Sequence, residues 1–339
     1  MARLVDLPVE LILVIIDYLQ VDMKQASLLY DGPGYDEGCD LDPPLSVSHL
    51  HSFLLANSRL SSLLQPLLYR DIFVYRNSQL KQLSRSLQEN PSLKEHIMSV
   101  TFPWHPYMNG SLDDISPFFR FTNLRTLTTY GFSDSLSLEF DKFSIGTSPV
   151  ECLRLIACGA QEEPLTTVLS WAGALKTLHY DVEQYGWDQW DTYKYIDDGP
   201  RLDLSEFTSL KTLRIYHAFL CGDFHGPYRV WKGLPYSLEV LEVFYDKTDD
   251  TPFLRENYEC DPFVLDLINH KRAHLPYLHT VTIHSTEKVR DSETGEELPV
   301  GFLTLPSLER EAESAGIKLK IWLGYQDAPT MRRLTFPSP

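Results

Sequence analysis

A short pattern of apolar and polar positions recurs along most of the chain. In each copy, mostly apolar residues occupy the first, fourth and sixth places, and polar residues are frequent between them. Because residues two apart in a strand lie on the same face, this pattern predicts one short buried strand per copy. The copies start at residues 97, 124, 150, 175, 210, 238 and 278, so most follow the previous one after about 25 to 28 residues. Their residues at the three places are Ile97-Val100-Phe102, Leu124-Leu127-Thr129, Val150-Leu153-Leu155, Leu175-Leu178-Tyr180, Leu210-Leu213-Ile215, Leu238-Leu241-Val243 and Leu278-Val281-Ile283.

The repetition predicts how these strands associate. Three subsegments are close to copies of one another: Leu124-Arg125-Thr126-Leu127, Leu175-Lys176-Thr177-Leu178 and Leu210-Lys211-Thr212-Leu213. A unit of this length cannot bury its apolar residues alone, so each strand is expected beside the previous one in a parallel sheet over a shared core. The predicted fold class is therefore α/β. A two-layer α/β domain without a true repeat period is the alternative.

The spacing and the intervals together resemble an irregular leucine-rich-repeat solenoid. That family has Asn or Cys after the strand, and here only Cys158 matches it; the equivalent places hold Phe132, Glu183, Ala218, Asp246 and Thr286. The resemblance implies an α/β solenoid with a parallel sheet and outer helices. It is expected to span residues 76–325, with a flexible tail at 326–339.

Several segments around the repeats carry helical patterns. The leucine spacing over residues 75–95 predicts a helix with Pro91 as a breaker, and residues 165–172 and 263–273 are expected to form outer helices. Residues 306–315 predict a terminal helix that stops at Gly316. Residues 317–321 then predict a last strand that covers the open edge of the sheet.

The amino-terminal stretch departs from this pattern, because its apolar residues are continuous. Pro8 suits the first turn of a helix, and Glu10 places a negative charge near the positive end of the helix dipole. From Leu11 to Ile16 every side chain is apolar, so a helix here needs cover on several sides. The local chain offers little core, which predicts a partner-binding surface. An ordinary buried first helix is the alternative interpretation.

This stretch resembles an F-box of the form common in fungal proteins. The motif is Leu7-Pro8-x-Glu10-Leu11-x-x-x-Ile15-x-x-Tyr18-Leu19, followed by Leu-Leu-Ala-Asn-Ser-Arg-Leu at 54–60 and Gln-Pro-Leu-Leu-Tyr-Arg-Asp-Ile at 65–72. The resemblance covers about residues 7–72, within a helical module expected at residues 1–75. One departure is an acidic insertion at residues 20–44, where the family has a short connection. A surface loop is its expected form.

The F-box resemblance implies a partner and a role. In that family the module docks on a Skp-type adaptor and so joins a cullin-containing ubiquitin ligase. A repeat domain behind it implies a non-catalytic substrate receptor; a scaffold or interaction protein outside any ligase is the alternative. The adaptor-binding residues that the resemblance implies are Leu7, Pro8, Glu10, Leu11, Ile15, Tyr18, Leu19, Leu60, Pro66, Leu67 and Leu68.

The acidic composition narrows the range of partners. The 339 residues contain 30 Lys and Arg against 47 Asp and Glu, a formal net charge of −17 with a pI of about 5.0. Phosphate backbones and anionic membranes repel such a chain, so neither nucleic acid nor membrane is an expected partner. The five cysteines are scattered without a Cys-x-x-Cys pair, and no signal-peptide pattern opens the chain. Free thiols and a cytoplasmic or nuclear location are therefore expected.

Sequence motifs for catalysis and cofactor binding are missing. The chain has no Gly-x-Ser-x-Gly elbow, no Gly-x-x-x-x-Gly-Lys-Ser/Thr loop and no Gly-x-Gly-x-x-Gly after a strand. His270 and His274 stand four apart, as a metal pair on a helix would, but no Glu follows His270 and a surface pair is the favoured interpretation. We expect a protein that is not an enzyme and holds no cofactor or metal. A hydrolase with a pocket at residues 187–195 is the alternative.

A local concentration of positive charge is predicted on the sheet face opposite the core. Since side chains alternate along a strand, basic residues of several repeats should share this face, with aromatic residues at the strand ends. Such a surface is predicted to bind an acidic segment of a substrate protein. Basic side chains that are merely solvated, or paired with acids such as Glu151, Glu239 and Glu242, are the alternative. The predicted substrate-binding residues are Arg125, Arg154, Lys176, His179, Lys211, Arg214, Tyr130, Tyr216 and Phe244, with His279, Trp104 and Tyr245 beside them.

Overall fold

A computed structural model provides the structure of the chain. It describes residues 14, 65–74, 77–102, 118, 120–130, 147–158, 169–170, 172–182, 202–217, 220, 230–245, 262–285, 301–303 and 305–323. The chain divides into two units, Met1–Ile72 with Gln326–Pro339, and Phe73–Tyr325. The second unit contains almost all of the described residues, and the following paragraphs concern it.

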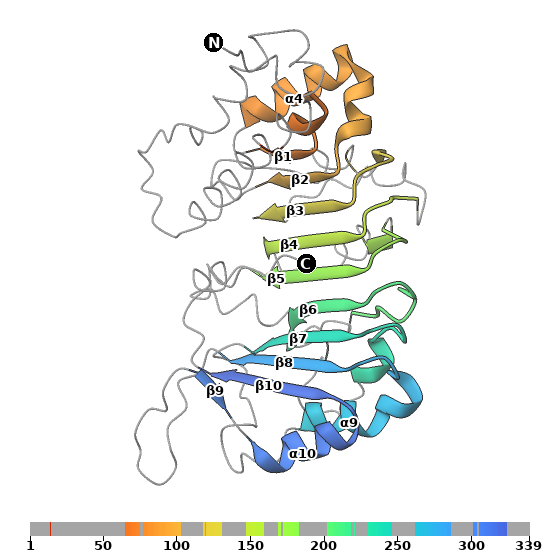
Figure 1. Cartoon of the computed structure of the whole chain (residues 1–339), viewed down its shortest axis with the longest axis vertical. Helices are drawn as coiled ribbons and strands as arrows, with labels where there is room; N and C mark the ends of the chain where they lie inside the picture. Colours follow the sequence, from red (N-terminus) through yellow and green to blue (C-terminus); the bar gives the residue numbers. More distant parts are fainter. Residues whose placement is uncertain are drawn as a thin grey trace, which may run out of the picture. The chain divides into compact units, whose positions relative to one another are not determined.

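The second unit is built around one sheet, in which the strands from β2 to β8 lie side by side in the order of the sequence (Figure 1). The described residues form ten strands in the order β1-β2-β3-β4-β5-β6-β7-β8-β10-β9. Neighbours from β2 to β8 are parallel, β10 is parallel to β8, and β9 is antiparallel to β10. The strands are β1 (Asp71–Phe73), β2 (Ser99–Phe102), β3 (Thr126–Tyr130), β4 (Cys152–Cys158), β5 (Thr177–Val182), β6 (Thr212–Tyr216), β7 (Val240–Tyr245), β8 (Thr280–Ser285), β9 (Gly301–Leu303) and β10 (Lys318–Leu323).

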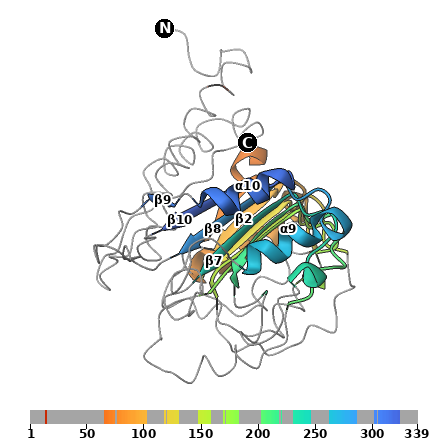
Figure 2. The same ribbon diagram turned by 90° about the horizontal axis from the view of Figure 1, so that it is seen from below.

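The register of the sheet explains the repeating pattern. Each fourth-place residue pairs with the fourth-place residue of the next repeat, as Leu153 does with Leu178, and the sixth places align in the same way in most repeats. All 21 residues at the first, fourth and sixth places are at most 5% exposed, including Thr129. Figure 2 looks along the stack, where the strands lie one behind another. Because the strands also pair in register, the residues at each of the three places form a continuous buried row. The α/β class and the seven predicted parallel strands are therefore confirmed.

Helices and 3₁₀ turns accompany the sheet. α4 (Asn77–Glu89) is followed by η2 (Pro91–His96), so Pro91 separates two helical segments as predicted. α9 (Pro262–His274) and α10 (Pro306–Ser314) lie beside the last strands in Figure 1, and α9 packs against η5 (Val230–Gly233) and α10. Leucines and other apolar residues on one side of each helix add to the buried core. They include Leu80, Leu87, Phe263, Val264, Leu267, Leu308 and Ala312.

The end of α10 shows why a glycine stands at its carboxyl terminus. Gly316 has φ of 74°, in the left-handed region that glycine adopts without steric cost. Its N–H donates to the Glu313 carbonyl at 2.8 Å, and the Ile317 N–H donates to the Ala312 carbonyl at 2.8 Å. This pair of bonds is a Schellman motif, which satisfies two carbonyls at the end of the helix. The predicted stop at Gly316 is confirmed.

The sheet edge differs from the prediction. Residues 317–321 were expected to be the final strand at the open edge, but β10 pairs on both sides, with β8 and with β9. The edge is formed by β9, a three-residue strand that comes before α10 in the sequence. Its antiparallel pairing lies outside the repeat pattern, so the sequence periodicity gave no signal for it. Of the helix predicted at 165–172, residues 169 and 170 are helical, and 165–168 lie outside the described residues.

Candidate functional site

The residues that immediately precede the strands form a continuous row across the sheet, at the end where the parallel strands begin. We call Met98, Arg125, Glu151, Lys176, Lys211, Glu239 and His279 the strand-start row. Each carbonyl in the row accepts hydrogen bonds from the next repeat; for example, the Arg125 N–H donates to the Met98 carbonyl at 2.8 Å. The same bond recurs between every consecutive pair of the row, at 2.7 to 3.0 Å. These backbone hydrogen bonds thus place the residues of the row next to one another, one residue from each repeat.

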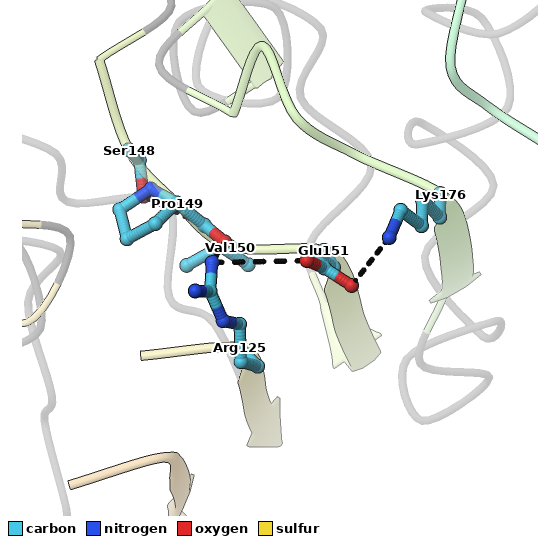
Figure 3. A network of polar contacts seen from close by, with 6 residues as sticks. All are labelled: Arg125, Ser148, Pro149, Val150, Glu151 and Lys176. Carbon is cyan, nitrogen blue, oxygen red and sulfur yellow. Dashed lines mark hydrogen bonds and ion pairs between the residues drawn. The ribbon is translucent and has the colours of Figure 1, made fainter. Parts of the chain in front are cut away.

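Charges of opposite sign alternate along part of the strand-start row. Glu151 lies between two cations, with its carboxylate 3.7 Å from Arg125 Nη1 and 2.8 Å from Lys176 Nζ (Figure 3). Lys211 Nζ is 2.6 Å from Glu239 Oε1 in the next pair. The hydrogen bond from Lys176 is the main cause that lowers the pKa of Glu151. The three cations in these pairs are 45 to 54% exposed and the two acids 35 to 37% exposed, so each pair contributes less than about 1 kcal/mol of stability.

A second row of charged residues lies at the centre of the strands, on the face opposite the core. We call Arg154, His179, Arg214 and Glu242 the strand-centre row; consecutive members pair in register across β4 to β7. They alternate with core residues such as Leu153 and Leu155, which point to the other face. Arg214 is 5% exposed and His179 is 6% exposed. In contrast to the strand-start row, these two side chains are enclosed by the protein.

A compact cluster surrounds Arg214. Its Nε lies 3.8 Å from Glu242 Oε2, and its guanidinium lies over the Phe244 ring at 4.5 Å. Phe244 in turn stacks on His284, with ring centroids 4.6 Å apart and an angle of 6° between the planes. His284 Nε2 is 3.9 Å from the same Glu242 oxygen. One carboxylate therefore faces an arginine and a histidine inside the protein, where charge interactions are stronger than in water.

Burial keeps three histidines of this unit uncharged. It lowers the pKa of His217 to about 3, and it also lowers the pKa of His284 to about 3, with a further contribution from Arg214. Burial is also the main cause that lowers the pKa of His179 well below 6.5, and the charges of Arg214 and Arg154 lower it further. The cause of each shift is that a low-dielectric surrounding disfavours the imidazolium.

We expect acid to unfold the protein through these histidines. Their folded-state pKa values lie below the unfolded value of about 6.5, so only the unfolded state binds protons between about pH 6.5 and 3. Stability is present above about pH 6.5 and is lost as the pH falls, by about 1.4 kcal/mol per histidine from about pH 7.5 to 5.5. Urea unfolding at both pH values measures the change. His217→Gln should reduce this loss by about 1.4 kcal/mol. An unchanged loss in that variant would contradict the prediction.

The predicted substrate-binding set divides between the two rows. Arg125, Lys176 and Lys211 lie in the exposed strand-start row, together with His279. Arg154 belongs to the strand-centre row and is partly buried, and the remaining described side chains, His179, Arg214 and Phe244, are buried. The set was expected to share one face; residues 125, 176 and 211 stand at exposed positions just before their strands, whereas His179, Arg214 and Phe244 stand at buried positions within them. The side chains of Trp104, Tyr130, Tyr216 and Tyr245 lie outside the described residues.

Most of the predicted adaptor surface lies outside the described residues. Leu7, Pro8, Glu10, Leu11, Ile15, Tyr18, Leu19 and Leu60 belong to this part of the chain. Residues 65–68 are helical, and Pro66, Leu67 and Leu68 are each partly exposed there. Val14, within the predicted first helix, is helical and 64% exposed.

The histidine pair of α9 has a structural explanation. Trp231 stacks on the rings of both His270 and His274, with centroid distances of 4.7 and 3.9 Å. His270 Nδ1 also lies 3.2 Å from the Asp266 carboxylate. Among the described residues, no group of three His, Cys, Asp or Glu side chains is placed to hold a metal ion. Burial raises the pKa of the Cys152 thiol, which disfavours the thiolate form.

Two exposed tyrosines were missed by the sequence analysis. Tyr236 and Tyr277 are each 57% exposed and contact each other at the turns before β7 and β8. A signal for them exists in the sequence, because Leu-Pro-Tyr occurs at 234–236 and again at 275–277. The repeat of an aromatic residue outside the buried places would have marked this site.

Comparisons with known proteins show no family for the chain. No family model matches it, and no curated protein matches it. Among solved structures, a protein of Bacteroides fragilis aligns with 80% of this chain and 68% of its own, at 14% sequence identity and a TM-score of 0.40. Within the part of the chain that the structure describes, the helices are too short or too polar to cross a membrane.

Proposed function

We propose that the chain is a substrate receptor of a Skp–cullin–F-box ubiquitin ligase. The observation that carries the proposal is the F-box-like motif of residues 7–19 together with the matching segments 54–60 and 65–72. Val14, the one described residue of the 7–19 stretch, is 64% exposed. In this role the chain has no catalytic residue of its own.

We further propose that the Phe73–Tyr325 unit is a leucine-rich-repeat type of solenoid. Its support is the arrangement of one strand per repeat, in sequence order, with the first, fourth and sixth residues of each repeat buried. Such a unit contacts mainly its neighbours and offers an extended surface to a partner. That surface suits the capture of a protein segment better than the enclosure of a small molecule.

The exposed strand-start row supports an acidic substrate segment. Its members Arg125, Lys176 and Lys211 are each about half exposed at the side chain. These cations are paired with Glu151 and Glu239. A substrate carboxylate could replace either acid as the partner, and the free energy lost with the original surface ion pair would be small. The mechanism is proximity: a substrate held in the same assembly as the ligase presents its lysine in an effectively intramolecular reaction.

Co-expression with a Skp-type adaptor and a cullin tests this function. The full chain is expected to recover both proteins in one complex that elutes together in size-exclusion chromatography. Recovery of the adaptor without the cullin would favour a scaffold outside the ligase. Recovery of neither protein would contradict the receptor function and the F-box assignment together.

A further inference from the structure

The turns before β7 and β8 expose a pair of tyrosines. The rings of Tyr236 and Tyr277 meet edge to face, with centroids 5.6 Å apart and an interplanar angle of 84°, and each residue is 57% exposed. Among the described residues of the Phe73–Tyr325 unit, the other exposed large apolar residue is Met98, at 41%. Tyrosine is enriched at protein interfaces because it offers a large apolar ring with a polar end.

The backbone around the pair is held firmly, so the exposure is built into the fold. Leu234 and Leu275, which open the two Leu-Pro-Tyr segments, are 3% and 0% exposed and anchor the turns in the core. The Leu238 N–H donates to the Pro235 carbonyl at 3.1 Å, and the Leu278 N–H donates to the Leu275 carbonyl at 3.0 Å. The turns thus present both tyrosines outward without using their rings for core packing.

Basic residues stand close to both tyrosines in the sequence, in η5 and in the last turn of α9. Lys271 Nζ donates to the carbonyl of Pro276, directly before Tyr277, at 3.3 Å. The last turn of α9 also contains Arg272 and His274 and has no acid, and both residues are exposed. Before Tyr236, Lys232 is exposed with its Nζ 5.5 Å from the Trp231 ring. These cations contrast with the formal net charge of −17 of the whole chain.

Acids also lie near this surface. Asp203 and Glu206 are both exposed, and the Leu204 N–H between them donates to the Gly233 carbonyl of η5 at 2.8 Å. Asp266 of α9 lies beside His270, and Glu239 pairs with Lys211 in the strand-start row. α10, which packs against α9, carries Glu309, Glu311 and Glu313 and therefore bounds the positive surface on its side. The cations at the end of α9 consequently favour a ligand that is acidic where it meets the last turn of this helix.

We propose that Tyr236 and Tyr277, with Lys232, Lys271 and Arg272, form a docking site for an acidic segment of a partner protein. An apolar side chain of the segment packs on the two rings, and its carboxylates face the three cations. The site lies on the strand-start side of β7 and β8, and it does not depend on the F-box-like motif. The docking site and the receptor function can therefore be tested independently of each other.

A displayed library of random peptides tests the site directly. The library is selected on the full chain and counter-selected on Tyr236→Ser/Tyr277→Ser, whose thermal unfolding is expected to match the original protein because both rings are exposed. Enriched peptides should be acidic and contain an apolar residue. Their synthetic versions should bind the double variant at least about tenfold more weakly in fluorescence anisotropy.

Two further variants separate the ring from the charge. Tyr236→Phe/Tyr277→Phe keeps the rings and should stay within about threefold of the original affinity. Lys271→Gln/Arg272→Gln should weaken binding and reduce its dependence on salt, because two cations are removed. The proposal is overturned if no peptide is enriched, if the enriched peptides have no acidic bias, or if sedimentation shows that the tyrosines instead mediate contact between two copies of the chain.

Discussion

Replacing Leu11 or Ile15 by aspartate is expected to abolish the recovery of a Skp-type adaptor with the chain. Both residues lie in the continuous apolar run of the F-box-like motif. Burying a side chain of this size is worth about 1.5 to 3 kcal/mol, and a carboxylate in its place adds an unpaired charge to the contact. The affinity should therefore fall by at least about a hundredfold in isothermal titration with purified adaptor.

A matched variant controls for general damage. Lys81→Asp also introduces an aspartate, but at an exposed position of α4 outside residues 1–75. It should leave adaptor binding unchanged. Normal binding by both Leu11→Asp and Ile15→Asp would show that this stretch does not form the adaptor surface, and the receptor function would lose its main support.

Arg214→Glu is expected to destabilise the Phe73–Tyr325 unit by about 3 to 5 kcal/mol. The side chain of Arg214 is 6% exposed, with its Nε 3.8 Å from the Glu242 carboxylate and its guanidinium over Phe244. The substitution would place two carboxylates together inside the protein and leave Glu242 without this positive charge. Urea unfolding near neutral pH measures the loss.

Lys211→Glu is the control for this change, since it makes the same charge reversal three residues earlier. The side chain of Lys211 is 54% exposed, and its pairing with Glu239 is a surface ion pair, so the cost should stay below about 1 kcal/mol. Equal effects of the two substitutions would contradict the distinction between the buried and the exposed row.

This difference corrects an expectation about charge reversal. From the sequence, changing Arg125, Lys176, Lys211 and Arg214 together to Glu should remove partner binding and leave the fold intact. Because Arg214 is buried, that combination would also destabilise the Phe73–Tyr325 unit. A triple change restricted to Arg125, Lys176 and Lys211 addresses binding alone, and unchanged capture of an acidic partner by that variant would exclude the strand-start row as the binding surface.

The repeat pattern was sufficient to predict the main sheet. Burial at the first, fourth and sixth places is a local requirement of each strand, so it can be recognised even where Thr129 replaces an apolar residue. The short strand β9 could not be predicted, because three residues are too few for a periodicity and its antiparallel partner β10 follows after a helix.

The candidate site was predictable only in part. The alternative in which the basic residues pair with neighbouring acids describes Arg125, Lys176 and Lys211 well, since Glu151 and Glu239 are their partners. Their exposure differs from that of Arg214, which is buried. The alternation rule applies only once the strand has begun, and these residues stand just before it.

The sequence by itself determined the seven repeat strands β2 to β8, their core-facing residues and the α/β class, because each depends on the spacing of apolar residues over a few positions. Only the tertiary structure decided which charged residues are exposed. The burial of His179 and Arg214, and the contact between Tyr236 and Tyr277, depend on residues that the chain brings together from different repeats. Exposure and pairing across repeats are properties of the packed structure, and no short stretch of sequence contains them.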